Sequence, residues 1–267
     1  MCYWVGTKKV REELEKRFRS EPKDEIAQLF YEAFIVGNQE YKDHYVAVGK
    51  GKPQITGLIK QDNTLQFQNF QWTLNYSYFD GRTSSTITRE LLNSTCERVF
   101  SQHKELIFTR RVLVPISGYF EYYHMGKETY PFYIYPKSGI FYAGGIWERQ
   151  TDEKTGEKSD NVSIITTPPN QLTQKIHNNP KAPNGSRMLL LIHESMAIDY
   201  LNDKIKQSDI QQFFKPFPHT EMNAHSVMRF QRKENFEFFN TEKVIEKYTY
   251  PELPELPELP ELPELLA

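Results

Sequence analysis

Cysteine and long apolar runs are both scarce in this chain of 267 residues, and each scarcity excludes a class of protein. The two cysteines, Cys2 and Cys96, are too few for a disulfide framework or a cysteine-rich zinc site. No apolar window is long enough to predict a membrane-spanning helix, and the first residues lack the pattern of a secretory signal. We therefore expect a protein of the reducing cytoplasm, with no metal and no organic cofactor.

An excess of charge of one sign is also missing. The chain has 33 basic and 35 acidic side chains, a formal net charge of −2, which argues against a generally basic nucleic-acid-binding protein. Five of the acids belong to the Pro-Glu-Leu triplets of residues 251–265, so the rest of the chain carries a mild positive excess. Any nucleic-acid-binding surface must therefore be a local groove.

The sequence shows no repeat of solenoid length and no domain boundary before its C-terminal triplets. We expect a single domain over residues 1–248, acting as a monomer. Residues 249–267 form a tail in which every triplet contains proline, which excludes a stable helix and favours an extended or disordered segment. The tail is either unstructured or a ligand for an unknown partner.

Hydrophobic patterning predicts an α+β fold. Apolar residues recur every four positions over residues 8–19, which indicates an amphipathic helix that Thr7 can cap. Residues 28–60, including Phe34-Ile35-Val36, suggest short strands and turns, and residues 64–80 alternate like a half-buried strand. The strongest strand pattern covers residues 106–147, where two turns predict an antiparallel meander. Further strands are expected at 161–167, 187–192 and 222–230.

Cys2 has distinctive chemistry if Met1 is removed, which a small second side chain permits. Its α-amine and thiol then lie on adjacent carbons. An α-amine has a pKa of roughly 7.7–8.0, well below about 10.4 for lysine, so more of it is neutral and nucleophilic near pH 7. It can condense with an aldehyde, and the thiol can close on the same carbon to give a thiazolidine. Alone, a cysteine at position 2 is as well explained by chance.

Three other residues are candidates for chemistry, and each has an ordinary alternative. Asn93 suits a helix cap or a turn. Glu121 interrupts an aromatic strand: it either points to water or, if buried, has a raised pKa suited to proton transfer near neutrality. His177 precedes an Asn-Asn-Pro turn, and a single histidine in a loop is more often a surface residue.

Taken together, several motifs in this order resemble the SRAP (SOS response-associated) family. They are Met1-Cys2, N-x-x-x-E at Asn93–Glu97, R-R-x-L-x-P-x-x-G-Y-F-E-Y at Arg110–Tyr122, FYAGGIW at 141–147, S-I-I-T-T at 163–167, I-H-N at 176–178, and Arg187-Met188. The resemblance extends from Cys2 to about Phe239. It implies antiparallel strands curled into an open barrel-like core with peripheral helices.

The resemblance also implies a function, which is binding single-stranded DNA at an abasic site and forming a stable thiazolidine with the ring-opened sugar. A weak lyase activity is a further implication. By motif, Cys2 is the nucleophile and Asn93 positions its amine or the sugar. Glu121 exchanges protons during ring opening and Schiff-base formation, and His177 assists protonation of the sugar. In a bacterium such a protein associates with the nucleoid.

DNA contacts require cations that follow the backbone and rings that stack on bases. The candidates are Arg98, Arg110, Arg111, Lys175 and Arg187, the rings of Trp72, Tyr76 and Tyr122, and the hydroxyl groups of Thr166 and Thr167. Any of them could instead be a solvated charge, a core ring or an ordinary strand residue.

The chain also departs from the family pattern. Tyr3 and Trp4 follow Cys2 where the family has Gly-Arg, Thr95 replaces an arginine, and the segment after Trp72 has lost the W-G-L-I-P pattern. Extra residues separate I-H from R-M, and Leu189 replaces a proline. We expect the chemistry to be kept while DNA affinity or strand preference differs.

Two other readings remain open. One is an N-terminal-cysteine peptidase or amidase, with Glu121 or His177 as the base, which would need oxyanion donors that the sequence does not reveal. The other is a non-catalytic module that binds single-stranded DNA or recruits partners through its tail.

Overall fold

A computed structural model of the chain describes residues 3–21, 23–151, 155–229 and 240–253. The helices are α1 Lys8–Ser20, α2 Glu25–Tyr31, α3 Val99–Gln102, α4 Lys104–Thr109, α5 Gln171–Ile176, α6 Ala197–Tyr200 and α7 Gln207–Gln212, with a π-helix, η1, over Glu32–Val36. The strands are β1 Trp4–Gly6, β2 Ala47–Val48, β3 Gln54–Gln61, β4 Thr64–Trp72, β5 Leu74–Asp80, β6 Ser85–Leu91, β7 Asn93–Thr95, β8 Arg111–Ile116, β9 Gly118–Met125, β10 Glu128–Pro136, β11 Phe141–Thr151, β12 Lys158–Thr167, β13 Met188–Leu189, β14 Leu191–Ile192 and β15 Met222–Ser226.

The centre of the fold is a closed ring of strands. β12 pairs with β4, β4 with β3, β3 with β8, β8 with β11, and β11 again with β12. Only the β12–β4 pairing in this ring is parallel. The predicted α+β fold with a barrel-like core is confirmed, although this ring is closed, which removes the edges that an open sheet would expose.

A second sheet, in the order β15-β10-β9-β1-β2, packs beside the ring. The β9–β10 hairpin turns at Gly126, whose φ of +61° suits glycine. β1 lies against β9 with Val5 opposite Tyr119 and Gly6 opposite Gly118. A Cβ atom at Gly118 would lie 2.5 Å from the Tyr133 ring, so glycine is required where β9 begins. This pairing places β1 beside the strand that carries Glu121.

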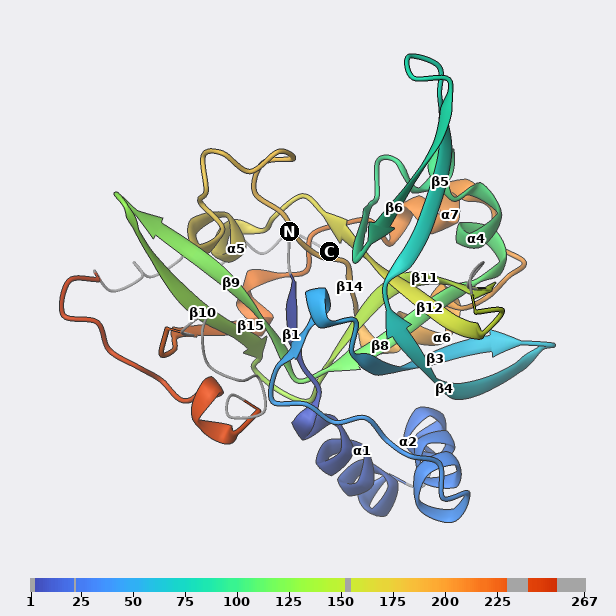
Figure 1. The fold of residues 1–267 in the computed structure, drawn as a ribbon. Coiled ribbons are helices and arrows are strands. Elements are labelled where there is room, and N and C mark those ends of the chain that lie inside the picture. Colours follow the sequence, from blue (N-terminus) through green and yellow to red (C-terminus); the bar gives the residue numbers. More distant parts are fainter. Residues whose placement is uncertain (1–2, 22, 152–154, 230–239, 254–267) are drawn as a thin grey trace.

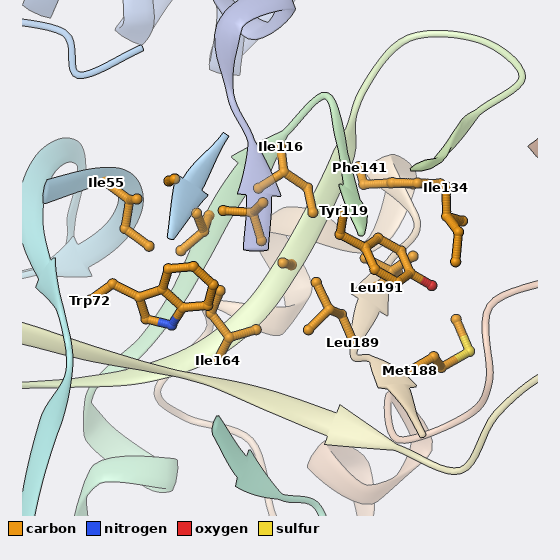
Figure 2. Packing of buried hydrophobic residues seen from close by; sticks show 14 of the residues in the cluster. Ile55, Trp72, Ile116, Tyr119, Ile134, Phe141, Ile164, Met188, Leu189 and Leu191 are labelled. Atoms are coloured by element: carbon orange, nitrogen blue, oxygen red, sulfur yellow. The ribbon is translucent and has the colours of Figure 1, made fainter. Parts of the chain in front are cut away.

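One apolar cluster joins the ring to the second sheet (Figure 2). Tyr119 of β9 and Phe141 of β11 lie with their ring centroids 6.4 Å apart. Trp72 is also in this cluster, and its indole N–H donates to the backbone oxygen of Leu92 at 2.9 Å. The cluster therefore holds together the strands from which the candidate site residues project.

The predicted helix over residues 8–19 is confirmed as α1, which lies next to α2 on the outside of the barrel (Figure 1). Its expected cap is wrong: the Thr7 hydroxyl donates to the backbone oxygen of Lys42 and accepts from the His44 N–H. Among the described residues, no helix combines the length and the apolar character needed to cross a bilayer.

The strand predicted around Phe34-Ile35-Val36 is also wrong, because these residues belong to η1. The Asp24 carboxylate accepts the Ala27 N–H at 2.9 Å and starts α2, which continues directly into η1. Phe30 and Phe34, four residues apart, pack with their centroids 4.8 Å apart. The N-cap signal and this helical spacing outweigh the strand propensity of the apolar run.

Residues 74–91, where the sequence suggested the end of a strand followed by a loop, form a hairpin of β5 and β6 instead. This hairpin, which we call the arm, projects beyond the rest of the fold (Figure 1). β6 is separated from β7, and so from Asn93, by Leu92 alone.

The first Pro-Glu-Leu triplet is part of the fold. The Tyr250 hydroxyl donates to the backbone oxygen of Val227 at 2.8 Å, and the Tyr130 hydroxyl donates to Glu252 at 3.2 Å. Leu253 packs against the main apolar cluster. The folded region therefore extends beyond the predicted boundary at residue 248. The remaining triplets, within 254–267, lie outside the described residues.

We predict that Tyr250→Ala lowers the free energy of unfolding by about 3 kcal/mol, because it empties a buried aromatic site. Truncation after Leu253 should leave the free energy unchanged, and it serves as the control in urea denaturation. A Tyr250→Ala variant as stable as the wild type would contradict the role of this contact, and a loss on truncation would show that the later triplets also stabilise the fold.

Candidate active site

Glu121 lies in the middle of β9, opposite Phe132 of β10. Its side chain is 4% exposed, and its Oε1 has no hydrogen-bond partner among the described residues. Burial raises the pKa of Glu121 to about 7, an effect that the positive N-terminus partly opposes. Of the two alternatives left by the sequence, the structure selects the buried carboxyl, which is half protonated near neutrality and so suited to act as both acid and base.

His177 follows α5, whose start is fixed by a capping box between Asn170 and Thr173. The His177 N–H donates to the Thr173 oxygen at 2.8 Å, and its imidazole is buried. Burial lowers the pKa of His177, and the positive N-terminus lowers it further. The ring is therefore neutral near pH 7 and able to accept a proton.

The backbone of Arg187 holds the His177 ring. Nδ1 of His177 lies 3.0 Å from the Arg187 N–H nitrogen and 3.1 Å from its carbonyl oxygen. The N–H can donate to an unprotonated Nδ1, and the carbonyl can accept from a protonated one. The backbone of Arg187 can therefore satisfy Nδ1 in either protonation state.

Asn178 ties this segment to β9. Its side-chain oxygen accepts the His124 N–H at 2.7 Å, and its amide group donates to the His124 oxygen at 2.9 Å. His124 is three residues beyond Glu121 on the same strand. The amide thus acts like one more residue of a neighbouring strand and keeps His177 near the strand of Glu121.

Arg187 connects His177 to the segment of Asn93. Its guanidinium donates two hydrogen bonds to the Glu97 carboxylate, at 3.0 and 2.9 Å. It also donates to the hydroxyl oxygen and to the backbone oxygen of Thr166. The pair lowers the pKa of Glu97, although burial acts in the opposite direction. Glu97 is the residue of the N-x-x-x-E motif whose role the sequence did not reveal.

Asn93 begins β7, which runs parallel to β12 with Asn93 opposite Ile164. Its side chain is buried, so neither a helix cap nor a surface turn describes it. A continuous set of contacts therefore links three of the four predicted residues: Asn93 through β7 to Arg187, and Arg187 through His177 and Asn178 to the strand of Glu121. Cys2 lies outside the described residues.

The expected DNA contacts of Trp72 and Arg111 are withdrawn. Trp72 is 0% exposed, so no base can stack on its ring. The Arg111 guanidinium is buried and donates to the backbone oxygens of Ile107, Phe108, Tyr200 and Asn202. Both residues hold the barrel to the segments around it.

The other predicted DNA contacts divide by exposure. Thr166, Thr167 and Arg187 are buried, and the Arg187 donors are already engaged within the protein. Arg98 is exposed, and Arg110, Lys175, Tyr76 and Tyr122 are half-buried. The guanidinium of Arg110 lies 5.1 Å from the centroid of Trp147. Tyr122 packs edge-on against Trp4, with centroids 5.9 Å apart.

Acidic, cysteine and histidine side chains do not gather into a metal site in the described part of the chain. No group of three or more of them is close enough to hold an ion there. The chemistry that these residues can supply is proton transfer and hydrogen bonding around a reacting group.

We predict that Glu121→Gln changes how stability depends on pH. The pKa of Glu121, about 7 in the folded chain, lies above its ordinary value of 4.5, so the folded state binds more protons between these values. The contribution of this carboxyl to the free energy of unfolding therefore falls as the pH rises through that window. Between pH 4 and pH 8 the free energy of unfolding of the variant should therefore rise by roughly 3 kcal/mol relative to that of the wild type, because one pKa unit corresponds to about 1.4 kcal/mol.

Urea denaturation of both proteins across this range provides the measurement. Glu105→Gln, at an exposed position of α4, serves as the control and should follow the wild type. A Glu121→Gln variant whose stability stays parallel to that of the wild type would contradict the raised pKa.

Comparisons with known proteins agree in sequence and in fold. The sequence profile of the family described as "SOS response associated peptidase (SRAP)" matches residues 1–230. "Abasic site processing protein YoqW" of Bacillus subtilis strain 168 is 22% identical over 213 residues, covering 78% of this chain and 88% of that protein. YoqW of Bacillus phage SPbeta matches with the same values.

Two solved structures share the fold. A protein from Bacteroides thetaiotaomicron has a TM-score of 0.69 at 23% identity, covering 93% of this chain and 100% of that one. A protein from Bordetella bronchiseptica has a TM-score of 0.61 at 14% identity, covering 85% and 100%. At these identities the likeness concerns the fold alone.

Proposed function

Because this chain belongs to the SRAP family, we propose that it processes abasic sites by binding single-stranded DNA and joining Cys2 covalently to the opened sugar. The observation that carries the proposal is the buried carboxyl of Glu121, with a pKa of about 7, on the strand that pairs with the N-terminal strand β1. The relative YoqW, which is named an abasic site processing protein, supports the same proposal.

The proposed reaction has two bond-forming steps. The Cys2 amine attacks the C1′ aldehyde of the ring-opened sugar, and the carbonyl oxygen leaves as water to give a Schiff base. The thiol sulfur then adds to the same carbon, while the thiol proton goes to the nitrogen. The product is a thiazolidine, and the balance is the loss of one water molecule from protein plus DNA.

Ring opening and condensation both require proton transfers, and Glu121 is suited to them. Near neutrality a useful fraction of its carboxyl is protonated and can protonate the departing hydroxyl, while the remainder can deprotonate the amine. His177, neutral because burial lowers its pKa, accepts or returns a proton at the sugar. Asn93 supplies an amide to orient the amine or the sugar.

We predict that the protein lacking Met1 forms a heat-stable adduct with a single-stranded oligonucleotide carrying one abasic site. A denaturing gel and intact mass should show protein plus DNA minus one water. Cys2→Ala and Cys2→Ser both keep the α-amine and lack the thiol, so each should yield a stable adduct only when borohydride reduces the Schiff base. Cys96→Ser is the matched control and should react like the wild type, because burial raises the pKa of the Cys96 thiol to about 11.

Other outcomes would favour the other two readings. Hydrolysis of an amide substrate without any adduct would indicate an N-terminal-cysteine peptidase or amidase. DNA affinity that survives Cys2→Ala, with no adduct in the wild type, would indicate a binding module.

Glu121→Gln should slow adduct formation, followed on the same denaturing gel, by about 10²-fold or more, which is the usual range for a lost general acid or base.

A further inference from the structure

A groove follows α2 on the outside of the barrel. Its two parts have volumes of about 840 and 460 Å³, and they adjoin because Glu25 and Ile198 line both. The lining comes from α1 and α2, from α6 and the 3-10 helix η3, Glu194–Met196, and from the turns that connect β10 to β11 and β3 to β4. The groove is therefore built where several outer elements meet the barrel.

Aliphatic side chains from three elements line this groove. Ile26 and Leu29 come from α2, Leu65 from β4 and Ile198 from α6. Ile26 is buried and packs into the fold, whereas Leu29 and Leu65 are half-buried. Ile198 is 39% exposed, and Met196, two residues before it, is 40% exposed. The groove thus offers an apolar surface that the described residues leave uncovered.

The charged side chains of the groove are mainly acidic. Six acidic and three basic side chains line it. Arg17 is buried and already pairs with Asp24 and Glu194. Glu21 and Asp199 are exposed and form no ion pair with a described side chain. Their charges are therefore free to meet those of a partner.

This charge selects among possible occupants. The chain without its Pro-Glu-Leu triplets has a mild positive excess, so the groove is a local negative area. It repels the phosphates of DNA, an anionic membrane and the acidic triplets of the chain itself. An apolar surface between acidic side chains fits a helix that carries aliphatic residues on one face and lysine or arginine beside them.

The groove is separate from the candidate active site. None of its lining residues belongs to β7, β9 or α5, the elements that position Asn93, Glu121 and His177. Figure 1 shows α1 and α2 at the opposite end of the molecule from the arm and well apart from α5. An occupant of the groove therefore leaves the reactive residues accessible.

We propose that this groove binds a basic amphipathic helix of a protein partner. The aliphatic face of that helix lies on Leu29, Leu65 and Ile198, and its basic side chains pair with Glu21 and Asp199. The inference goes beyond the proposed function and requires none of its chemistry. It gives the protein a surface for a partner that can remain bound while the candidate active site is occupied.

Fluorescence anisotropy with a labelled synthetic helix tests the inference. The probe is a peptide of about 14 residues, roughly four helical turns, with leucine on one face and lysine on the other. The full chain should bind it saturably at low salt, and more weakly as salt screens the charges. A peptide of the same composition in shuffled order, which has no apolar face, should bind about threefold more weakly or worse.

Three variants locate the binding site. Glu21→Lys and Asp199→Lys should each weaken binding about threefold or more, because each replaces an attraction with a repulsion. Glu21 directly follows α1, where a lysine is compatible with the helix dipole. Ile198→Ser should weaken binding about fivefold or more through the lost apolar contact.

Matched controls lie outside the groove and should bind like the wild type. Glu105→Lys makes the same charge change at an exposed position of α4, and Met228→Ser removes an apolar side chain that is 48% exposed. Equal affinities of the wild type, Glu21→Lys and Ile198→Ser would overturn the inference. So would a peptide that slows adduct formation with the abasic oligonucleotide, because it would occupy the reactive pocket.

Two further results would assign the groove to another occupant and also overturn the inference. Truncation after Leu253 that raises the peptide affinity severalfold would show that the Pro-Glu-Leu tail fills the groove. Self-association that Ile198→Ser abolishes would show that a second copy of the protein does. Absence of any adduct would instead refute the proposed function and leave this inference intact.

Discussion

The candidate site depends on one ion pair, between Arg187 and Glu97. The Arg187 guanidinium holds Glu97, just after β7, and the backbone N–H of Arg187 holds the His177 ring. Removing Glu97 would leave the buried guanidinium of Arg187 without its anionic partner, which is more costly than losing an exposed pair. Arg187 is therefore a positioning residue, and its two functional groups explain why R-M and N-x-x-x-E occur together in one sequence.

Glu121 differs from Arg187 in that it is buried without an ion pair to a described side chain. Among the described residues no lysine or arginine pairs with its carboxyl, and the positive N-terminus offsets only part of the effect of burial, so the fold holds an ionisable group where charge is unfavourable. A stable protein would place an apolar residue there, and the aromatic strand around it would accept one. The instability at this position is the source of its reactivity, since a carboxyl in water would be fully ionised and a poor acid at pH 7.

The sequence predicted the class of fold and the candidate residues better than it predicted their surroundings. Strand alternation and turn signals located β8 to β12, because those signals are local. Trp72 and Arg111 were misassigned because a motif does not reveal which face of a strand is buried. The helical Phe34 was missed because the cap at Asp24 lies ten residues earlier. The placement of Asn178 against His124 depends on the tertiary fold, so only coordinates could reveal it.

The two hydrogen bonds between Asn178 and His124 determine how freely the length of the following loop can vary. Asn178 fixes one end of residues 179–186, and Arg187 fixes the other. Between two fixed ends, added length costs only a slowly growing closure entropy. Insertions can therefore accumulate there without moving the imidazole, so this segment can differ in length between relatives that keep the histidine in place.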